Sequence, residues 1–319
     1  MKNIQKSSKL KKFLSIVIPV CNSERSILRI YERIIALFDK TNYEIEIIMV
    51  EDHSKDKSWQ VIEKLSKKDK RIRGIKLSRN FGQHAATLCG INYSKGDYVA
   101  TIDDDLEQPP EKLLELLEEA EKGYDIVYGI FKNKTHNIWR KFSSRLINYI
   151  LNLLTPNFKN YSSMRVLTKN IAKELSKFDS PYPIIDGYLN WLTNNYSFVE
   201  LKHEYRFSGK SNYGIRNLLN LSRNFIIGFS EGPIQIFSIL GILMSLVGFS
   251  YAIYIIVQKL IGISILSGYS SIMSAILIIG GLQLFLIGIF GDYIARINSS
   301  TSKKPLFIVS IDTNSNSSK

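Results

Sequence analysis

Residues 13–52 have the sequence FLSIVIPVCNSERSILRIYERIIALFDKTNYEIEIIMVED. Runs rich in β-branched residues occupy 13–20 and 44–52, and the stretch near 25–39 between them is amphipathic at helical spacing. This order predicts a strand, a helix and a second strand. Because parallel strands need a crossover connection, usually a helix, the segment predicts the first βαβ unit of an α/β fold.

The same alternation continues after residue 52 and predicts further elements. They are a helix near 56–69, a strand IRGIKLS at 72–78, a helix near 83–94, a strand DYVATID at 97–103, a helix near 110–122 and a strand DIVYGI at 125–130. We therefore predict a mostly parallel sheet with flanking helices.

In open sheets of this kind, ligands bind beyond the carboxyl ends of the strands. The residues that follow the predicted strands are unusually polar. They are Pro19, Asn22 and Glu24 after the first strand, Glu51 and Asp52 after the second, Arg79 and Asn80 after the third, and Asp103, Asp104 and Asp105 after the fourth. We expect these residues to meet at one edge of the sheet and to form the functional site.

Two long apolar runs follow the α/β region. Residues 234–258 and 260–291 contain no charged side chain, and each exceeds the ~20 apolar residues that a membrane-spanning helix needs. They predict two transmembrane helices, at about 234–258 and 270–294. The predicted organisation is a basic N-terminal tail at 1–12, an α/β domain at 13–212, a juxtamembrane amphipathic segment at 213–233, the two helices within 234–296 and a C-terminal tail at 297–319.

The distribution of basic residues predicts the topology in the membrane. Lys259 stands at one edge of the loop between the spans, whereas Arg296, Lys303 and Lys304 follow the second span. The positive-inside rule therefore places both termini and the α/β domain in the cytoplasm. The first 233 residues carry +10 of the net charge of +13. Beside two spans, this charge fits a membrane surface and anionic substrates better than nucleic acid.

The segment TIDDDLEQPPE at 101–111 places three consecutive carboxylates, Asp103 to Asp105, at the end of a predicted strand. Such neighbours repel one another unless a cation lies among them. Carboxylate oxygens with room for substrate phosphates favour Mg²⁺ or Mn²⁺. The alternative is a solvated acidic turn that caps the helix beginning near Pro110.

The segment HEYRFSGKSNY at 203–213 leads into the juxtamembrane segment. It offers cationic and hydroxyl donors that suit a phosphate group, namely Arg206, Lys210, Ser211 and Tyr213. The alternative is a basic stretch that contacts lipid headgroups without specificity.

Five segments carry a resemblance to known proteins: SIVIPVCNSE (15–24), IIMVEDHSKDKSW (47–59), LSRNFGQHAA (77–86), TIDDDLEQPPE (101–111) and HEYRFSGKSNY (203–213). Together they resemble glycosyltransferase family 2, and within it the polyprenyl-phosphate glycosyltransferases related to dolichyl-phosphate mannose synthase and the bacterial undecaprenyl-phosphate sugar transferases. The last two segments are the specific ones. The resemblance spans nearly the whole chain and implies a GT-A fold.

The resemblance also implies roles for individual residues. Those expected at the donor are Pro19, Asn22, Glu24 and Asp52 around the base and ribose, Asp103 and Asp105 facing the diphosphate and the metal, and Arg79 and Asp104 beside them. The implied metal ligands are Asp103, Asp105 and Glu107, and the implied catalytic residues are Asp105, Arg165 and Arg206. For Arg165 the alternative is a structural ion pair. The implied acceptor-phosphate site consists of Arg206, Lys210, Ser211 and Tyr213.

Several residues depart from the family's pattern. Glu51 and His53 replace the Asp and Gly of an Asp-Asp-Gly-Ser turn, and Glu107 stands where the lipid-phosphate branch usually has Gln. Glu107 keeps an oxygen ligand. Because His reaches the left-handed region at modest cost, we expect the turn at His53 to be retained.

The predicted activity is the inverting transfer of a sugar from a UDP- or GDP-linked donor to a polyprenyl phosphate of the undecaprenyl type. The predicted enzyme is an integral protein of the bacterial plasma membrane. One alternative is a processive polysaccharide synthase of the same fold, which usually has more spans and a Gln-x-x-Arg-Trp segment that this sequence lacks. A second is a catalytically silent, nucleotide-binding membrane scaffold, whose expected loss of the metal carboxylates is not seen. The identity of the sugar and the formation of a homo-oligomer are left open.

Overall fold

The computed structural model describes residues 12–131, 163–178, 183–201, 268–301 and 304–315, together with six positions between 250 and 261. The chain divides into two compact units. One consists of residues 1–137, 158–214 and 305–319, and the other of residues 138–157 and 215–304.

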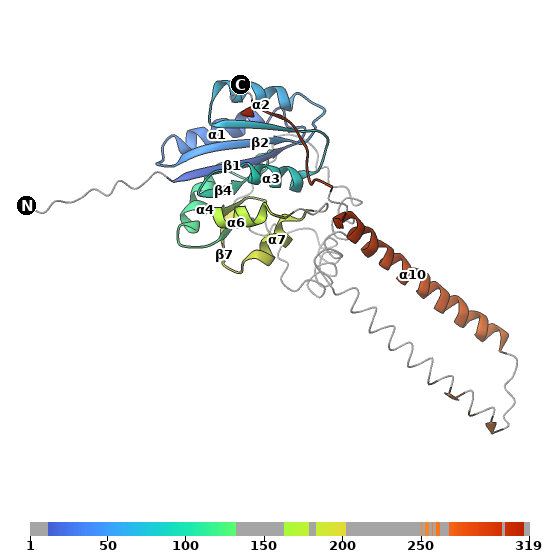
Figure 1. Ribbon diagram of the computed structural model, residues 1–319. Coiled ribbons are helices and arrows are strands. Elements are labelled where there is room, and N and C mark those ends of the chain that lie inside the picture. The colour runs from blue at the N-terminus through green and yellow to red at the C-terminus, as the bar shows by residue number, and fades with distance from the viewer. Residues whose placement is uncertain are drawn as a thin grey trace, which may run out of the picture. The chain divides into compact units, whose positions relative to one another are not determined.

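In its described residues, the first unit is built on a sheet with the strand order β7-β5-β6-β4-β1-β2-β3-β8 (Figure 1). The strands are β1 (Phe13–Val20), β2 (Glu44–Glu51), β3 (Ile72–Leu77), β4 (Tyr98–Thr101), β5 (Ile126–Phe131), β6 (Arg165–Thr168), β7 (Tyr196–Leu201) and β8 (Val309–Asp312). Parallel pairing joins β1 to β2 and β4, β2 to β3, and β5 to β7. The antiparallel pairs are β4–β6, β5–β6 and β3–β8. The prediction of a mostly parallel sheet is confirmed.

The helices of this unit include the four that the sequence predicts between residues 25 and 122. They are α1 (Ile27–Phe38), α2 (Ser58–Lys68), α3 (Gln83–Asn92), the short 3₁₀ helix η1 (Pro110–Lys112) continued by α4 (Leu113–Ala120), α6 (Lys169–Leu175) and α7 (Ile185–Leu192). The predictions did not include β6, β7, β8, α6 and α7.

Successive residues of β1 face opposite sides of the sheet. Leu14, Ile16 and Ile18 belong to a buried cluster with apolar residues of α1, α2 and α4. Val17 faces the other side, where α3 packs closely, because a Cβ added to Gly90 would lie 2.3 Å from Cγ1 of Val17. This packing of α3 against the sheet helps to position its amino end beside the acidic turn, where Gln83 Nε2 donates to Asp103 Oδ1 at 2.6 Å.

The second unit contributes helix α10 (Tyr269–Thr301), which covers the predicted second span. The predicted first span lies largely outside the described residues. Among the described residues, no helix combines the length and apolarity that crossing a membrane requires.

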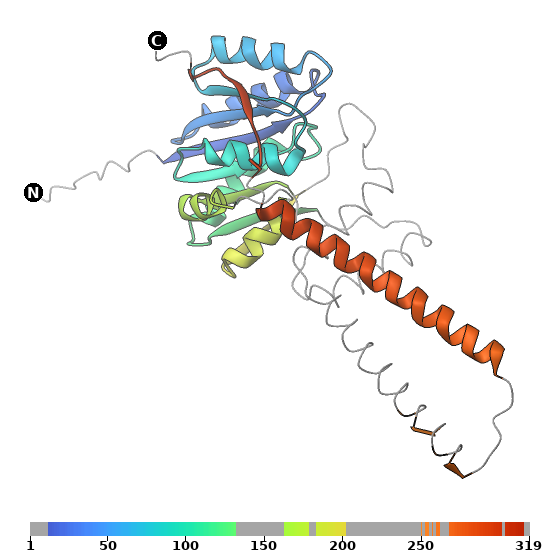
Figure 2. The ribbon, with the colours of Figure 1, turned by 45° about the vertical axis from the view of Figure 1, so that its right-hand side comes forward.

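The chain after α10 forms strand β8 within the predicted C-terminal tail. Val309, Ile311 and Asp312 pair with the end of β3 at one edge of the sheet (Figure 2). The sequence did not predict this pairing.

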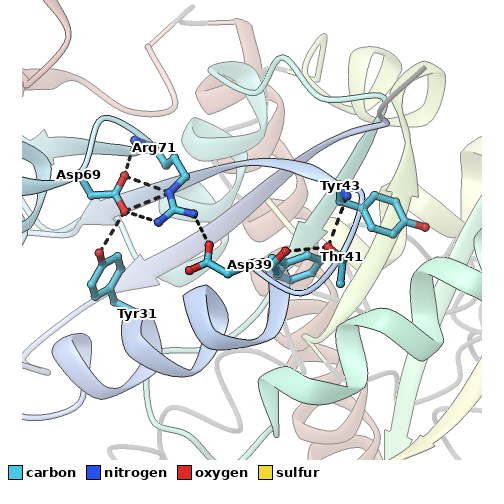
Figure 3. Close-up of polar contacts among 7 residues, drawn as sticks. Tyr31, Asp39, Thr41, Tyr43, Asp69 and Arg71 are labelled. Carbon is cyan, nitrogen blue, oxygen red and sulfur yellow. Dashed lines mark hydrogen bonds and ion pairs between the residues drawn. The ribbon is translucent and has the colours of Figure 1, made fainter. Parts of the chain in front are cut away.

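A polar cluster joins the connections at the amino ends of β2 and β3 (Figure 3). Arg71 donates from Nη1 to Asp39 at 2.7 Å and from Nη2 to Asp69 at 2.8 Å. The hydroxyl of Tyr31 donates to the same Asp69 carboxylate at 3.0 Å. The cluster therefore fixes the ends of α1 and α2 at the edge of the sheet opposite the polar strand ends.

Replacing Asp69 by asparagine is expected to lower the free energy of unfolding by about 1–3 kcal/mol at pH 7, because Arg71 loses a charged partner. The hydrogen bond from Arg71 holds the pKa of the Asp69 carboxyl below its usual range. A lowered folded-state pKa stabilises the fold above the unfolded pKa of about 3.9, and this contribution is lost as the pH falls through the folded value. Thermal unfolding measured at pH 7 and below pH 4 should show that the difference in Tm between variant and wild type is smaller in acid. An equal difference at both pH values would contradict the assignment.

Candidate active site

Side chains of the loop after β1 accept hydrogen bonds from backbone N–H groups of the loop after β2. Asn22 Oδ1 accepts a hydrogen bond from the backbone N–H of Lys55 at 2.8 Å, and Glu24 Oε2 accepts one from Lys57 N at 3.0 Å. Asn22 and His53 both have a left-handed backbone, with φ of 56° and 54°. The expectation that the turn is retained at His53 is confirmed.

Asp52 joins the loop after β2 to the loop after β3. Its carboxylate accepts hydrogen bonds from Phe81 N at 2.7 Å and Gly82 N at 2.8 Å. The side chain of Asn80 donates to the backbone carbonyl of Asp52 at 3.0 Å. Burial raises the pKa of Asp52, and the two backbone hydrogen bonds oppose that effect. Asp52 therefore fixes the relative position of two loops.

The acidic turn follows β4, and its first carboxylate is held by three side chains. Asp103 accepts hydrogen bonds from Gln83 at 2.6 Å, from Gln108 at 3.2 Å and from the hydroxyl of Ser163. Burial raises the pKa of Asp103 to about 6, and repulsion from Asp105 adds to this effect. The turn thus holds negative charge where water stabilises it poorly.

The other carboxylates of the turn have different surroundings. Asp104 accepts a hydrogen bond from Cys21 N at 3.0 Å, and burial raises the pKa of Asp104 to about 6. Asp105 Oδ1 accepts one from Glu107 N at 3.0 Å. Leu106 is buried and has a left-handed backbone with φ of 63°. In this turn Asp104 contacts the loop after β1, whereas Asp105 lines the cavity described next.

A cavity of about 400 Å³ lies at this edge of the sheet. Its lining includes four carboxylates, a guanidinium and an imidazole, from Asp103, Asp105, Glu107, Asp186, Arg165 and His84. Pro19, a predicted donor residue, also lines it. The cavity therefore combines negative groups with a buried cation.

Arg165 is 3 % exposed and is held at its place on the cavity by several groups. Its guanidinium forms an ion pair with Asp186, donates from Nε to the carbonyl of Ser163 at 3.3 Å, and lies 5.9 Å from the ring centre of Tyr128. Arg165 therefore lines the cavity and also forms the ion pair that was the alternative, and its catalytic role stays a prediction.

Some predicted residues are not brought to the cavity. Asn22, Glu24, Asp52 and Asp104 belong to the surrounding loops, and the exposed Arg79 stacks on Phe81 with 4.7 Å between guanidinium and ring centre. Their roles at the donor stay predictions. Four predicted residues, Arg206, Lys210, Ser211 and Tyr213, lie outside the described part of the chain.

The sequence did not single out Asp186, Ser163, Gln83, His84 or Gln108. Gln83, His84 and Gln108 lie inside quoted motifs, so their position next to the strand ends was an available signal. Ser163 and Asp186 belong to no quoted motif. Ser163 lies just before β6, and Asp186 lies in the first turn of α7.

The carboxylates of the cavity fit a divalent cation chemically. In the described residues, no three or more His, Cys, Asp or Glu side chains are gathered closely enough to bind a metal ion. Mg²⁺ commonly takes one or two carboxylates and completes its shell with water and substrate phosphates, so a complete protein cage is not required. Asp103 and Asp105 supply hard oxygen atoms at a cavity whose lining includes four carboxylates and one guanidinium.

A largely parallel α/β sheet with a carboxylate-lined cavity beyond β4 is the arrangement of the GT-A glycosyltransferases. The chain belongs to glycosyl transferase family 2, which it matches over residues 15–182. Residues 232–297 match the GtrB C-terminal hairpin.

Relatives of similar length support this assignment. The glycosyltransferase YkcC of Bacillus subtilis (strain 168) is 32% identical over 304 residues, which cover 92% of each chain. An undecaprenyl-phosphate 4-deoxy-4-formamido-L-arabinose transferase of Edwardsiella ictaluri (strain 93-146) is 31% identical over 302 residues, which cover 93% of each chain.

Solved structures share the fold at low sequence identity. Glucosyl-3-phosphoglycerate synthase from Mycobacterium tuberculosis, in complex with Mn²⁺ and uridine-diphosphate-glucose, superposes with a TM-score of 0.51 at 18% identity, over 68% of this chain and 77% of that one. Mannosyl-3-phosphoglycerate synthase from Rubrobacter xylanophilus gives a TM-score of 0.52 at 17% identity, over 66% and 70%. These similarities establish the fold alone.

Proposed function

We propose that the protein transfers a sugar, with inversion, from a UDP- or GDP-linked donor to a polyprenyl phosphate at the bacterial plasma membrane. The observation that carries the proposal is the cavity at the strand ends, where Asp103, Asp105 and Glu107 meet the buried Arg165. The match of the following region to the GtrB hairpin and the undecaprenyl-phosphate transferases among the relatives support a lipid phosphate as acceptor.

The reaction breaks the bond between the anomeric carbon and the diphosphate and forms one to a lipid phosphate oxygen. A phosphate monoester has a second pKa of about 6, so it is largely dianionic at pH 7 and attacks without a general base. Catalysis then depends on positioning and on neutralising the leaving diphosphate.

The residues of the chain divide these tasks. Asp103 and Asp105, with Glu107 beside them, would hold a Mg²⁺ or Mn²⁺ ion, which when bound offsets the negative charge of the diphosphate. Gln83, Gln108 and Ser163 orient the Asp103 carboxylate through the hydrogen bonds described above. Asp186 holds the guanidinium of Arg165 on the cavity.

The proposal is tested with purified protein, undecaprenyl phosphate, Mn²⁺ and a panel of UDP- and GDP-sugars. The expected product is a lipid phosphate that carries a single sugar, identified by its mass. A polymer would favour the processive synthase, and tight nucleotide binding without any product would favour the silent scaffold.

The proposed topology predicts that the loop between the spans faces away from the cytoplasm. In a variant with Cys21 and Cys89 replaced by serine, a cysteine introduced by Ser267→Cys should react with a membrane-impermeant maleimide on intact cells. The matched Ser302→Cys variant, beyond the second span, should react only after the cells are opened. The reverse pattern would refute the topology.

A further inference from the structure

Strand β8 is connected to β3 by side chains as well as by backbone pairing. Arg73 donates from Nε and Nη2 to the two carboxylate oxygens of Asp312, at 3.1 and 2.6 Å. Both side chains are mostly buried, with exposed fractions of 14% and 12%. Gly74 N donates to Thr313 Oγ1 at 2.9 Å, and Thr313 N donates to the carbonyl of Gly74 at 3.0 Å. The contact therefore includes a two-point, charge-assisted pair, which is among the stronger polar contacts in proteins.

The pairing extends past the end of β3 into the loop that reaches the candidate site. Ser78 N donates to the carbonyl of Ile308 at 2.9 Å. Three and four residues later in the chain, the backbone N–H groups of Phe81 and Gly82 donate to Asp52. The next residue, Gln83, donates to Asp103. The segment held by β8 is thus continuous with the segment that holds two carboxylates of the site.

Besides its contact with β8, the loop 78–82 is held at its other end by the hydrogen bonds of Asn80, Phe81 and Gly82 to Asp52. Ser78, Arg79 and Asn80 are exposed. Gly82 has a φ of +91°, which glycine adopts without strain, but glycine is equally free to adopt other backbone conformations. Without β8, β3 would become the edge strand of the sheet, and the ends of edge strands open locally at low cost. The position of the loop is therefore expected to depend on β8.

We propose that β8 is a positioning strand for the donor site: by pairing with β3 it holds loop 78–82 so that Phe81 and Gly82 fix Asp52, and Gln83 fixes Asp103. Only the identity of the ligand as a nucleotide rests on the proposed function. The strand is the next described element after α10, so the C-terminal tail supplies part of the support for Asp52 and Asp103, two carboxylates from the first third of the sequence.

A matched pair of variants separates positioning from general stability. Asp312→Asn weakens the pair with Arg73 at β8, whereas Asp69→Asn weakens the pair with Arg71 just before the amino end of the same strand β3. Both changes replace a carboxylate bound to arginine by an amide of the same shape. Only the first is expected to alter the loop, and because the asparagine variant is conservative, it should fold even where Asp312→Ala does not.

The first measurement is amide hydrogen exchange in the full-length protein without ligand. Asp312→Asn should speed exchange at Phe81 and Gly82 by about tenfold, and Asp69→Asn should leave these amides at the wild-type rate. Unchanged exchange at Phe81 and Gly82 in Asp312→Asn, or equal acceleration in both variants, would overturn the proposal.

The second measurement is calorimetric binding of UDP and of GDP, each with Mn²⁺. If only about a tenth of the Asp312→Asn molecules keep the competent loop, the apparent Kd rises about tenfold, whereas Asp69→Asn should bind like wild type. A wild-type Kd for Asp312→Asn and Asp312→Ala would overturn the positioning role. If the wild-type protein binds neither nucleotide, the proposed donor is wrong, and the exchange measurement still decides the role of β8.

Discussion

Replacing Asp105 by alanine is expected to reduce turnover by about 10²- to 10³-fold while the protein stays folded, by analogy with the loss of one preorganised charge-stabilising group. Asp105 lines the cavity beside Asp103 and Glu107. A divalent cation held there would offset the charge that develops on the departing diphosphate. Initial rates at saturating donor, with and without Mn²⁺, measure the effect. Wild-type activity should disappear in excess chelator and return when Mn²⁺ or Mg²⁺ is added.

Asp104→Ala is the matched control for this experiment. It removes a carboxylate from the same turn, but the Asp104 side chain accepts a hydrogen bond from Cys21 N and does not line the cavity. A metal-binding role for Asp105 predicts a far smaller loss in Asp104→Ala. Equal losses would instead point to the overall charge of the turn, and an unimpaired Asp105→Ala enzyme would refute the metal site.

The parallel core of the fold was predictable because each of its elements carries a local signal. The β-branched runs of β1 and β2 and the amphipathic stretch of α1 stand next to one another in the chain, and βαβ units join such neighbours. Strand β8 gave no such signal. It is four residues long, is followed by polar residues, and its partner Arg73 lies 239 positions away from Asp312. Short strands that depend on distant pairing cannot be recognised from a local pattern.

The candidate site likewise contains residues that a local sequence pattern predicted and residues that it did not. The acidic turn was predictable, because three adjacent carboxylates at a strand end demand compensation. The groups that support it were not: Ser163 bonds Asp103 across 60 positions, and Asp186 pairs with Arg165 across a segment that has no motif. Hydrogen-bond partners of this kind are set by the antiparallel return of β6 beside β4, which the periodicity of the sequence did not reveal.

Replacing Arg206 by alanine is expected to weaken the use of polyprenyl phosphate by about tenfold to hundredfold, because a charge-assisted hydrogen bond to a phosphate is worth roughly 1.5–3 kcal/mol. The carboxylates of the candidate site lie beyond the carboxyl ends of the strands, whereas Arg206 belongs to the basic segment that precedes the predicted first span. Donor affinity should therefore stay near wild type. Acceptor saturation curves in detergent, at fixed donor, measure the change in KM.

The detergent condition distinguishes acceptor binding from contact with lipid headgroups, because no anionic bilayer remains to attract a basic side chain. Arg223→Ala is the matched control, since Arg223 lies in the predicted juxtamembrane segment and outside the predicted acceptor-phosphate set. If Arg206 binds the lipid phosphate, its alanine variant keeps a raised acceptor KM in detergent, while Arg223→Ala becomes indistinguishable from wild type. If both variants recover together, Arg206 contacts headgroups only, and the acceptor phosphate must be held by other residues.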